Sequence, residues 1–380
     1  REKEFKMRIK TLDIARGLII LGMIWVHLRT WWLREEDSWF NDISRLLIDR
    51  IFGPAFILLS GISLIIWYRI ASIKAKELEN YSKSIMKKEY YFRALILLII
   101  AVIYNIVVVI VSLDLIWLWS WFILFALAFS MLMSYPFFRT SKLFRIIYAF
   151  LIIIINQIIV TILWPYEGQL NVYGVLFHLF YYPLLLYPVL ISYAFYLLGT
   201  VLGDLLFEVF QIENIAERRL ALRNKVVIPS FIISTVLIIL GSIYLAELYW
   251  MDYPFAWVPF SISTILIAAS ILLTFEVYGY FDTKKSYKFT YYFSYYSLTV
   301  YLGHNVLYLL FYRQLNIISF FIAFFIVAIL MGLALRAIHK RWRSKFSLKV
   351  QMGKMAIFLA CMLEHIDVVA LKKEFQRSIE

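Results

Sequence analysis

Cysteine and charged residues are both scarce in this chain, and each scarcity excludes a class of protein. A single cysteine, Cys361, excludes a disulfide framework and a cysteine-ligated metal centre. Charged residues make up only 17% of the 380 residues, whereas hydrophobic residues make up 63%. A water-soluble domain cannot bury so much apolar surface. The composition therefore predicts an all-α, polytopic integral membrane protein.

Familiar catalytic signatures are missing as well. The sequence contains no GxxxxGK[ST] phosphate loop and no GxGxxG, HExxH or GxSxG motif. The histidines show no spacing suited to zinc, so we expect no metal; they are His27, His178, His304, His339 and His365. The net charge of +13 falls in short loops between apolar runs, so membrane topology explains it and we expect no nucleic-acid partner.

Hydropathy predicts about ten membrane-spanning helices. Their expected ranges are 12–31, 51–70, 94–112, 115–134, 146–164, 187–207, 226–246, 257–277, 293–312 and 316–336. The apolar stretch 173–186 is expected to lie at the membrane interface or to re-enter it. Residues 1–338 are then expected to form the transmembrane domain, and residues 339–380 a cytoplasmic or interfacial amphipathic tail.

Loop charges predict the orientation of these spans. Lysine and arginine gather before the first span and after the second, fourth, sixth, eighth and tenth, and ten spans place all of these loops on one side. The opposite loops are acidic or neutral and include Glu35. The positive-inside rule therefore predicts cytoplasmic N- and C-termini, in a multi-pass protein of the plasma membrane.

The first span carries three ionisable residues, Asp13, Arg16 and His27. Arg16 and His27 lie about three helical turns apart, so they share one face at a separation of ~16 Å. Asp13 lies one turn before Arg16 and is placed to pair with it. Each residue alone also fits an ordinary interfacial position. Together they predict an anion anchor near one membrane surface and a titratable imidazole deeper in the bilayer, both facing one hollow.

Two further spans carry polar residues. In the second, Ser60, Gly61 and Ser63 are suited to close helix packing, while Arg50 lies near the level of His27. In the ninth, a polar stripe at helical spacing is more typical of a cavity wall than of lipid-facing residues; it consists of Ser297, Tyr301, His304 and Tyr308. An inventory of histidine, arginine, aspartate, serine and tyrosine suits acyl transfer, in which a histidine base deprotonates an amine or hydroxyl and cations hold an acidic donor.

Three of these motifs carry a resemblance to a known family. Arg16 and His27 match the Arg, ten residues, His signature of the membrane acyltransferase-3 superfamily. The stretches 56–61 and 297–304 resemble its F-x-x-x-S-G and S-x-x-x-Y-x-x-H motifs. Within the superfamily, the first two spans look most like the branch named for heparan-alpha-glucosaminide N-acetyltransferase. Lysosomal members of that branch have asparagine near position 27 and a histidine before the second span, where this chain has none.

The resemblance implies transfer of an acetyl group from cytoplasmic acetyl-CoA to an amine or hydroxyl of an amino sugar, glycan or lipid head group on the outer side. His27 is the expected catalytic base, with Asp13 orienting Arg16; a covalent acetyl-histidine is the rival path. Membrane lipids and a second copy of the chain, in a homodimer, are further expected partners. The expected acetyl-CoA-binding residues are Arg16, Ser60, Arg93, Tyr301 and His304, and the expected acceptor-binding residues are Glu35 and Arg50.

Two alternatives from other classes remain at this point. A transporter or lipid flippase would line its path with the same polar stripes, and its transport would be indifferent to acetyl-CoA. A non-catalytic membrane scaffold would tolerate replacement of His27. The absence of an internal repeat weakly disfavours a transporter.

Overall fold

The computed structural model describes residues 9–182, 188–242, 257–280 and 287–377, and in these ranges the chain is built from helices. Nine of the described segments are long and apolar enough to cross a membrane. Their principal helices are α1 (Lys10–Trp32), α3 (Arg50–Glu77), α4 (Lys83–Ser112), α5 (Ile123–Ser134), α6 (Lys142–Leu163), α8 (Val189–Phe210), α10 (Ile228–Leu240), α12 (Val258–Val277) and α15 (Ile317–Trp342).

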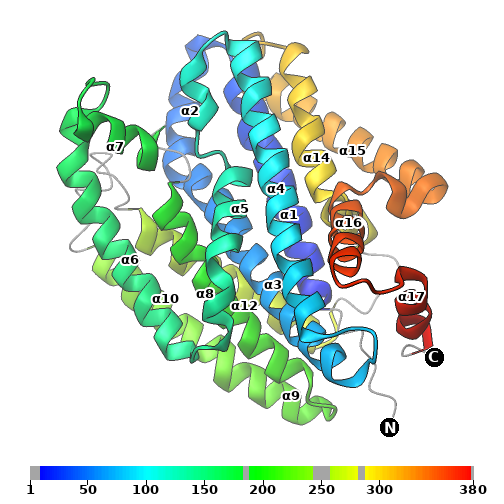
Figure 1. Cartoon of the computed structure of the whole chain (residues 1–380). Coiled ribbons are helices and arrows are strands. Elements are labelled where there is room, and N and C mark those ends of the chain that lie inside the picture. Colours follow the sequence, from blue (N-terminus) through cyan, green and yellow to red (C-terminus); the bar gives the residue numbers. More distant parts are fainter. Residues whose placement is uncertain (1–8, 183–187, 243–256, 281–286, 378–380) are drawn as a thin grey trace.

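Shorter helices connect and flank these spans. They are α2 (Ser38–Ser44), α7 (Val172–Tyr181), α9 (Ile215–Leu222), α13 (Lys288–Tyr295), α14 (Ser297–Gly303), α16 (Leu348–Leu363) and α17 (Val368–Arg377). In Figure 1, α1, α3 and α4 stand at the centre, with α6 and α10 on one flank and α15 to α17 on the other. Helix α7 is a short apolar helix within the stretch expected at the interface, and residues 183–186 of that stretch lie outside the described residues.

Nine of the ten predicted spans agree with described helices, apart from residues 187 and 243–246, which lie outside the described residues; the exception is the predicted span 293–312. This stretch is broken into α13, α14 and a 3-10 helix, η8 (His304–Leu309). The backbone turns at Tyr296, and neighbouring side chains bond the freed carbonyls: Lys349 Nζ donates to Ser294 O at 3.0 Å and Ser347 Oγ donates to Tyr295 O at 2.8 Å. A broken helix is tolerated at membrane depth when its freed backbone groups are bonded in this way.

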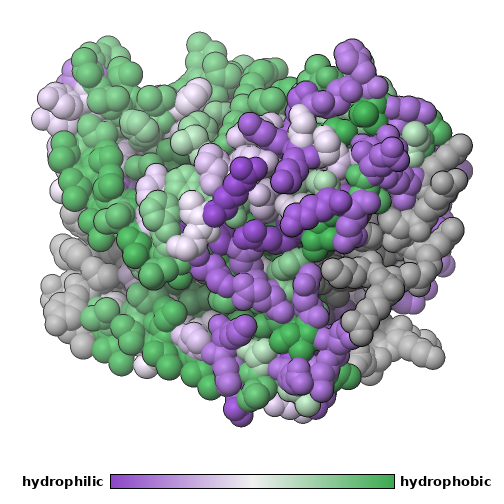
Figure 2. Space-filling model, turned by 60° about the horizontal axis from the view of Figure 1, so that its bottom comes forward, coloured by the Kyte–Doolittle hydropathy of each residue, from purple (hydrophilic) through white to green (hydrophobic). Residues whose placement is uncertain are grey.

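Cationic side chains mark one end of the bundle, which we call the basic side. It holds the N-terminal end of α1, residues 78–82 between α3 and α4, and the 3-10 helix η4 (Tyr135–Arg139). Arg219 of α9 donates to Val277 O at the end of α12, so α9 lies there too. Figure 2, which brings this end forward, shows hydrophilic residues gathered across it. We call the other end, with α2 and the start of α3, the opposite side.

Helices α3 and α8 pack backbone against backbone. A Cβ on Gly61 would lie 2.2 Å from the carbonyl oxygen of Tyr196, so only glycine allows this approach. Small residues at helix contacts are the usual basis of tight packing in membranes. The expectation that Gly61 permits close packing is therefore confirmed. The neighbouring helices pack around this α3–α8 contact.

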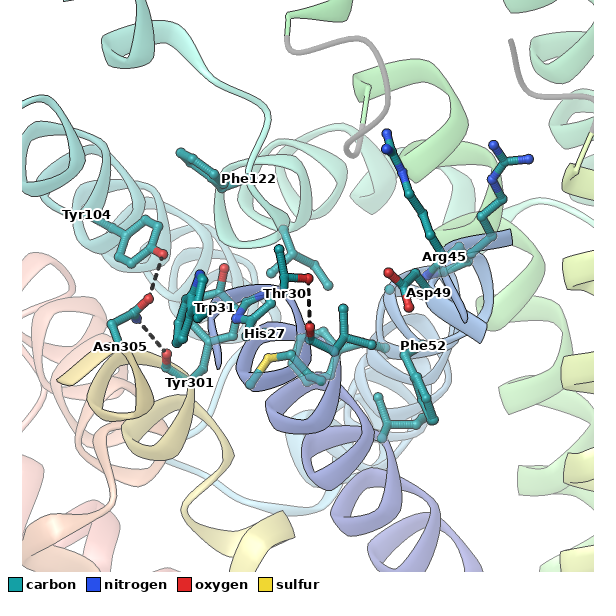
Figure 3. Close-up of a pocket in the computed structure, with 18 of the residues that line it drawn as sticks. His27, Thr30, Trp31, Arg45, Asp49, Phe52, Tyr104, Phe122, Tyr301 and Asn305 are labelled. Carbon is teal, nitrogen blue, oxygen red and sulfur yellow. Dashed lines mark hydrogen bonds between the residues drawn. The ribbon is translucent and has the colours of Figure 1, made fainter. Parts of the chain in front are cut away.

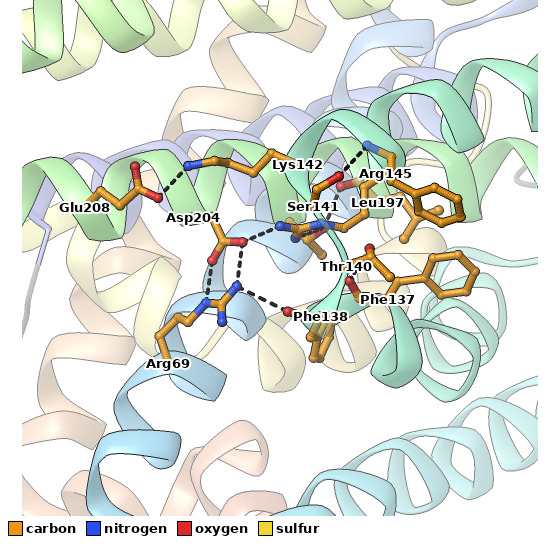
Figure 4. A network of polar contacts seen from close by, with 12 residues as sticks. Arg69, Phe137, Phe138, Thr140, Ser141, Lys142, Arg145, Leu197, Asp204 and Glu208 are labelled. Atoms are coloured by element: carbon orange, nitrogen blue, oxygen red, sulfur yellow. Dashed lines mark hydrogen bonds and ion pairs between the residues drawn. The ribbon is translucent and has the colours of Figure 1, made fainter.

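A buried carboxylate ties three helices together near the basic side. Asp204 of α8 accepts from Arg69 Nε at 2.7 Å and from Arg69 Nη2 at 2.9 Å, and it also pairs with Arg145 of α6 (Figure 4). Arg145 is 1% exposed and also donates to Thr200 Oγ1 at 2.9 Å. Arg69 reaches Phe138 O of η4 at 3.2 Å. The network fixes α3, α6 and α8 relative to one another.

Candidate functional site

Arg16 and His27 lie on one face of α1 but line two separate cavities, whereas the sequence predicted a single hollow. Arg16 lines a cavity of about 550 Å³ toward the basic side, which we call the basic cavity. His27 lines a cavity of about 370 Å³ toward the opposite side, which we call the opposite-side cavity. The shared helix face is as expected, because Arg16 contacts Ser294 of α13 and His27 contacts His304 of η8.

Helix α1 is anchored at both ends. Its first backbone amides, of Lys10 and Thr11, donate to the carboxylate of Glu276 at 2.8 and 2.7 Å, which satisfies orphan amides and places a negative charge at the helix N-terminus. A Cβ on Gly17 would lie 2.2 Å from Thr290 O, so glycine lets α13 approach closely. At the far end, Trp32 Nε1 donates to Leu307 O at 2.9 Å. This last contact holds η8 against the end of α1 that carries His27.

His27 and His304 form a directly bonded pair. Nδ1 of His27 lies 2.5 Å from Nε2 of His304, and the two rings meet edge to edge, with centroids 4.8 Å apart and planes inclined by 26°. His304 Nδ1 lies 2.6 Å from Tyr301 O and 3.3 Å from Val300 O. Carbonyl oxygens only accept hydrogen bonds, so Nδ1 of His304 carries the proton and its Nε2 accepts from His27. In the neutral pair, Nε2 of His27 is then the basic nitrogen.

The end of α14 sets the orientation of His304. The helix gives way to η8 at His304, and the carbonyls of residues 300–302 lie at this helix end, where Val300 O still accepts from the His304 amide. His304 bonds two of them, and Asn305 Nδ2 donates to Tyr301 O at 3.3 Å and to Leu302 O at 3.2 Å. The chain therefore satisfies a buried helix end with the imidazole that orients His27.

The opposite-side cavity combines aromatic walls with charged residues. In Figure 3, His27 stands beside Trp31, with Tyr104, Tyr301 and Asn305 on one side and Arg45 and Asp49 on the other. The rings of Trp31 and His304 are stacked, with centroids 5.7 Å apart. Arg50, Phe52 and Trp257 also line it. The arrangement offers a base, stacking surfaces and cations to one ligand.

Asp49, which lines this cavity, is bound by a buried arginine. Arg29 binds it through both oxygens, Nη1 to Oδ1 at 3.0 Å and Nη2 to Oδ2 at 2.6 Å. Arg29 itself is 1% exposed, and its Nε donates to Asn41 Oδ1 at 2.8 Å. Arg45 and Arg50 line the same cavity, so its described lining carries two cations and this carboxylate.

The basic cavity is lined by α1, α3, α4 and α16. It carries several cations and one carboxylate, together with Trp67 and Tyr81. The cations are Arg16, Lys74, Arg93, Lys349 and Lys354, and the carboxylate is Glu89. Such a balance favours a ligand with several negative charges. Lys349 and Lys354 belong to α16, so the expected tail contributes to this cavity together with the membrane helices.

Arg16 is held by hydroxyl groups from two helices. Its guanidinium donates to Ser63 Oγ of α3 and, at 3.4 Å, to Ser294 Oγ of α13. Ser294 Oγ in turn donates to Asp13 Oδ1 at 3.2 Å. Asp13 therefore reaches Arg16 through Ser294, which fits the predicted orienting role. It lies toward the basic side, about four helical turns from His27, so it can contact Arg16 through Ser294 but not a group bound at His27.

Glu89 holds the second arginine of the basic cavity. Its Oε1 accepts from Arg93 Nη2 at 2.5 Å and from Arg93 Nε at 3.1 Å, and its Oε2 accepts from Tyr81 at 2.7 Å. Burial raises the pKa of the Tyr81 hydroxyl, so this group stays protonated and donates. The Arg93 guanidinium also lies over the ring of Trp67, 4.8 Å from its centroid. The arginine is thus fixed with one face toward the cavity.

The structure distributes the sequence-predicted site residues over four places. Arg16 and Arg93 line the basic cavity, while His27, Arg50 and Tyr301 line the opposite-side cavity and His304 stands directly behind His27. Ser60 lines neither cavity: its Oγ donates to Phe56 O at 2.8 Å, between Phe56 of one lining and Ser63 of the other. Glu35 is exposed and pairs with Arg313 at the surface.

Sequence reasoning missed residues that reach the cavities through tertiary contacts. Lys349 and Lys354 lie far along the chain from Arg16, and their only signal was basic character in an otherwise apolar segment. Asn305, directly after His304, was passed over because it lies off the helical stripe. Among the described residues, no three histidine, cysteine or acidic side chains are grouped as metal ligands.

Comparison with known proteins gives one match. The family model described as heparan-alpha-glucosaminide N-acetyltransferase, catalytic, matches residues 8–232, more than half of the chain. The match contains Arg16, His27 and Arg93 but ends before His304 and Lys349. No curated protein and no solved structure matches the chain. On the strength of the family match, this chain belongs to the heparan-alpha-glucosaminide N-acetyltransferase catalytic family.

Proposed function

We propose that the protein transfers an acetyl group from acetyl-CoA in the basic cavity to the amine of an amino sugar or glycan in the opposite-side cavity, with His27 as general base. The observation that carries the proposal is the His27–His304 pair. Because His304 accepts from Nδ1 of His27, it leaves Nε2 of His27 as the proton acceptor in a cavity large enough for a sugar.

The basic cavity suits the nucleotide end of coenzyme A. Its surplus of cations matches the phosphates, and Arg16 and Arg93 are already held in place by Ser63 and Glu89. Trp67, which packs against Arg93, offers an apolar surface for a nucleobase or for the pantetheine arm. The family uses acetyl-CoA as its donor in general, which agrees with this charge balance.

The thioester must then reach His27 from the basic cavity. The two cavities are separated by about three turns of α1, ~16 Å. Met23 and Phe56 line the opposite-side cavity, and Ser60 lies between it and Ser63 of the basic cavity. We place the pantetheine arm along this seam between α1 and α3. The small and flexible side chains there can move aside and let the arm pass between the two helices. Ser60 is then a donor-binding residue only while the arm occupies the seam.

The reaction follows as a direct displacement. The amine nitrogen attacks the thioester carbonyl carbon, so a C–N bond forms and the C–S bond breaks. Nε2 of His27 takes the proton from the amine, and the departing thiolate of coenzyme A takes that proton from His27. His304 holds the His27 ring in the required tautomer throughout. A hydroxyl acceptor would react in the same way, with a C–O bond in place of the C–N bond.

We further propose that the basic side faces the cytoplasm of a plasma-membrane protein. Support comes from the cations that line the basic cavity, from the hydrophilic residues gathered at this end and from the positive-inside rule. In this orientation the donor cavity opens toward cytoplasmic acetyl-CoA, and the acceptor cavity opens toward the outer surface.

The decisive experiment uses purified protein in lipid nanodiscs with acetyl-CoA labelled in the acetyl group. With glucosamine as acceptor, the proposal expects labelled N-acetylglucosamine and an equal amount of free coenzyme A. An unchanged amount of acetyl-CoA, together with no measurable binding of coenzyme A by calorimetry, would reject the enzymatic assignment. Transport of glucosamine that ignores acetyl-CoA would instead favour the carrier alternative.

A further inference from the structure

A third cavity adjoins the reaction centre, and its lining is apolar. It has a volume of about 250 Å³ and lies between α1, α3, α8 and α12. We call it the lateral groove. Besides aliphatic side chains and Phe52, its lining includes two threonines, whose hydroxyls are already bonded to backbone carbonyls: Thr11 to Leu272 O at 3.1 Å and Thr264 to Phe260 O at 2.9 Å. The groove therefore suits a hydrocarbon chain and excludes a sugar or a phosphate.

The lateral groove opens to the membrane and also reaches the opposite-side cavity. Leu18 of α1 and Ala268 of α12 lie at its rim and are exposed on the lipid-facing surface. At the other end, Ile19 and Phe52 line both the groove and the cavity of His27. The Phe52 ring lies so close to Gly22 that a Cβ there would meet it at 2.2 Å. Phe52 thus forms the partition between the two spaces.

The dimensions of the groove match one leaflet of a bilayer. Along α3 it extends from Ile51 to Ile62, about three turns or ~16 Å, which is roughly half of a ~30 Å hydrocarbon core. It runs from the level of the opposite-side cavity toward the basic side. A lipid in the leaflet at the opposite side extends its chain toward the basic side, as the groove does. Its head group then lies at the level of His27.

Charge at the junction indicates what links the chain to the head group. Arg50 directly precedes the groove residues Ile51 and Phe52, and Arg45 lines the same cavity one turn earlier. Both arginines therefore lie where the groove meets the cavity, beside Asp49. Arginine pairs well with phosphate oxygens in such a position.

We propose that the acceptor is a lipid-linked sugar, with its hydrocarbon chain in the lateral groove, its phosphate or diphosphate at Arg45 and Arg50, and its sugar at His27. This inference rests on the proposed acetyl transfer for the role of the sugar, but the binding of a phosphorylated chain can be measured without any transfer. An acyl donor with a long chain would fill the groove as well, but it would bring no phosphate to Arg45 and Arg50.

The test uses dodecyl phosphate carrying a diazirine on its chain, bound to the full chain in nanodiscs, with labelled peptides located by mass spectrometry. The expected labels fall on α1 and α12 residues of the groove. Unlabelled dodecyl phosphate should compete, while dodecanol and inorganic phosphate should each compete at least about tenfold more weakly. Even labelling of all lipid-facing helices, or equal competition by dodecanol, would overturn the proposal.

Paired variants separate the groove from general effects on the membrane surface. Ala268→Trp fills the rim of the groove and should lower labelling about tenfold. Ala334→Trp makes the same change at another exposed alanine, on α15, and should leave labelling unchanged. Ala269→Leu, inside the groove, serves as a milder second variant should the first fail to fold. Equal labelling of all of these variants would also overturn the proposal, while leaving acetyl transfer to glucosamine untouched.

Discussion

His304 lies behind His27, with its Nε2 2.5 Å from Nδ1 of His27 and its own Nδ1 directed at Tyr301 O, so one histidine determines which nitrogen of the other is basic. A fixed tautomer matters for a general base, because only an unprotonated nitrogen directed at the acceptor removes its proton. The partner histidine comes from a helix break almost three hundred positions away in the sequence, and the break itself supplies the carbonyls that orient it.

Replacement of His27 tests the assigned base. We expect His27→Ala to fold normally and to lower kcat for acetyl transfer roughly 10²–10⁴-fold, the range that a positioned general base contributes. His178→Ala is the matched control, since His178 lies on α7 outside both cavity linings. Near-normal turnover in the His27 variant would remove the base from this residue. Recovery of acetylated His27 after rapid quenching of the native enzyme would support the covalent path instead.

Two substitutions of His304 separate a chemical from a purely structural role. His304→Gln keeps an oxygen that accepts from Nδ1 of His27, whereas His304→Leu keeps only bulk. We expect the glutamine variant to retain a substantial part of kcat and the leucine variant to lose most of it, while both bind coenzyme A with native affinity. The pH dependence of kcat should shift in the leucine variant, because the His27 tautomer is no longer fixed. Identical profiles in both variants would contradict the positioning role.

The basic cavity should lose donor affinity when its cations are removed. Arg16→Ala and Lys349→Ala are each expected to weaken coenzyme A binding about 10- to 100-fold by calorimetry, the worth of a charge-assisted contact. Higher salt should narrow the difference. Arg34→Ala is the control, because Arg34 lies on the opposite side and pairs with Asp37 at 2.8 Å. Unchanged affinity in both cavity variants would place the donor elsewhere.

The buried network at Asp204 should support stability and not catalysis. Asp204→Leu leaves Arg145, which is 1% exposed, without its carboxylate, and breaking such a buried pair costs about 3–5 kcal/mol. Glu208→Leu provides the comparison: Glu208 pairs with Lys142 at a partly exposed position, where loss costs at most about 1 kcal/mol. Thermal unfolding in nanodiscs measures both. A smaller loss for Asp204 than for Glu208 would be contrary to this account.

The contact between α3 and α8 should not tolerate even a methyl group. Gly61→Ala places a Cβ against Tyr196 O, so the helices must separate, at an expected cost of about 1–3 kcal/mol. Gly241→Ala adds the same atom where, among the described residues, no heavy atom beyond the adjoining backbone lies within 4 Å, and it should be close to neutral. Equal melting temperatures for the two variants would mean that α3 and α8 adjust without strain.

The sequence alone determined the membrane class, nearly all of the spans and the register of Arg16 with His27. These properties depend on local patterns, since hydropathy and the helical repeat act within about twenty residues. The same logic predicted an unbroken ninth span. It failed there because the bonds that stabilise the break come from Ser347 and Lys349, which lie far along the chain.

Only the tertiary structure decided which polar residues share a cavity. Three features depend on the packing of helices that are far apart in the sequence. They are the pairing of His27 with His304, the addition of Lys349 and Lys354 to the basic cavity, and the lateral groove beside Phe52. It also separated Arg16 from His27 into two cavities, although both lie on one helix face. A helix repeat fixes the direction of a side chain, but the neighbouring helices determine whether that side chain meets a ligand, a partner residue or packed hydrocarbon.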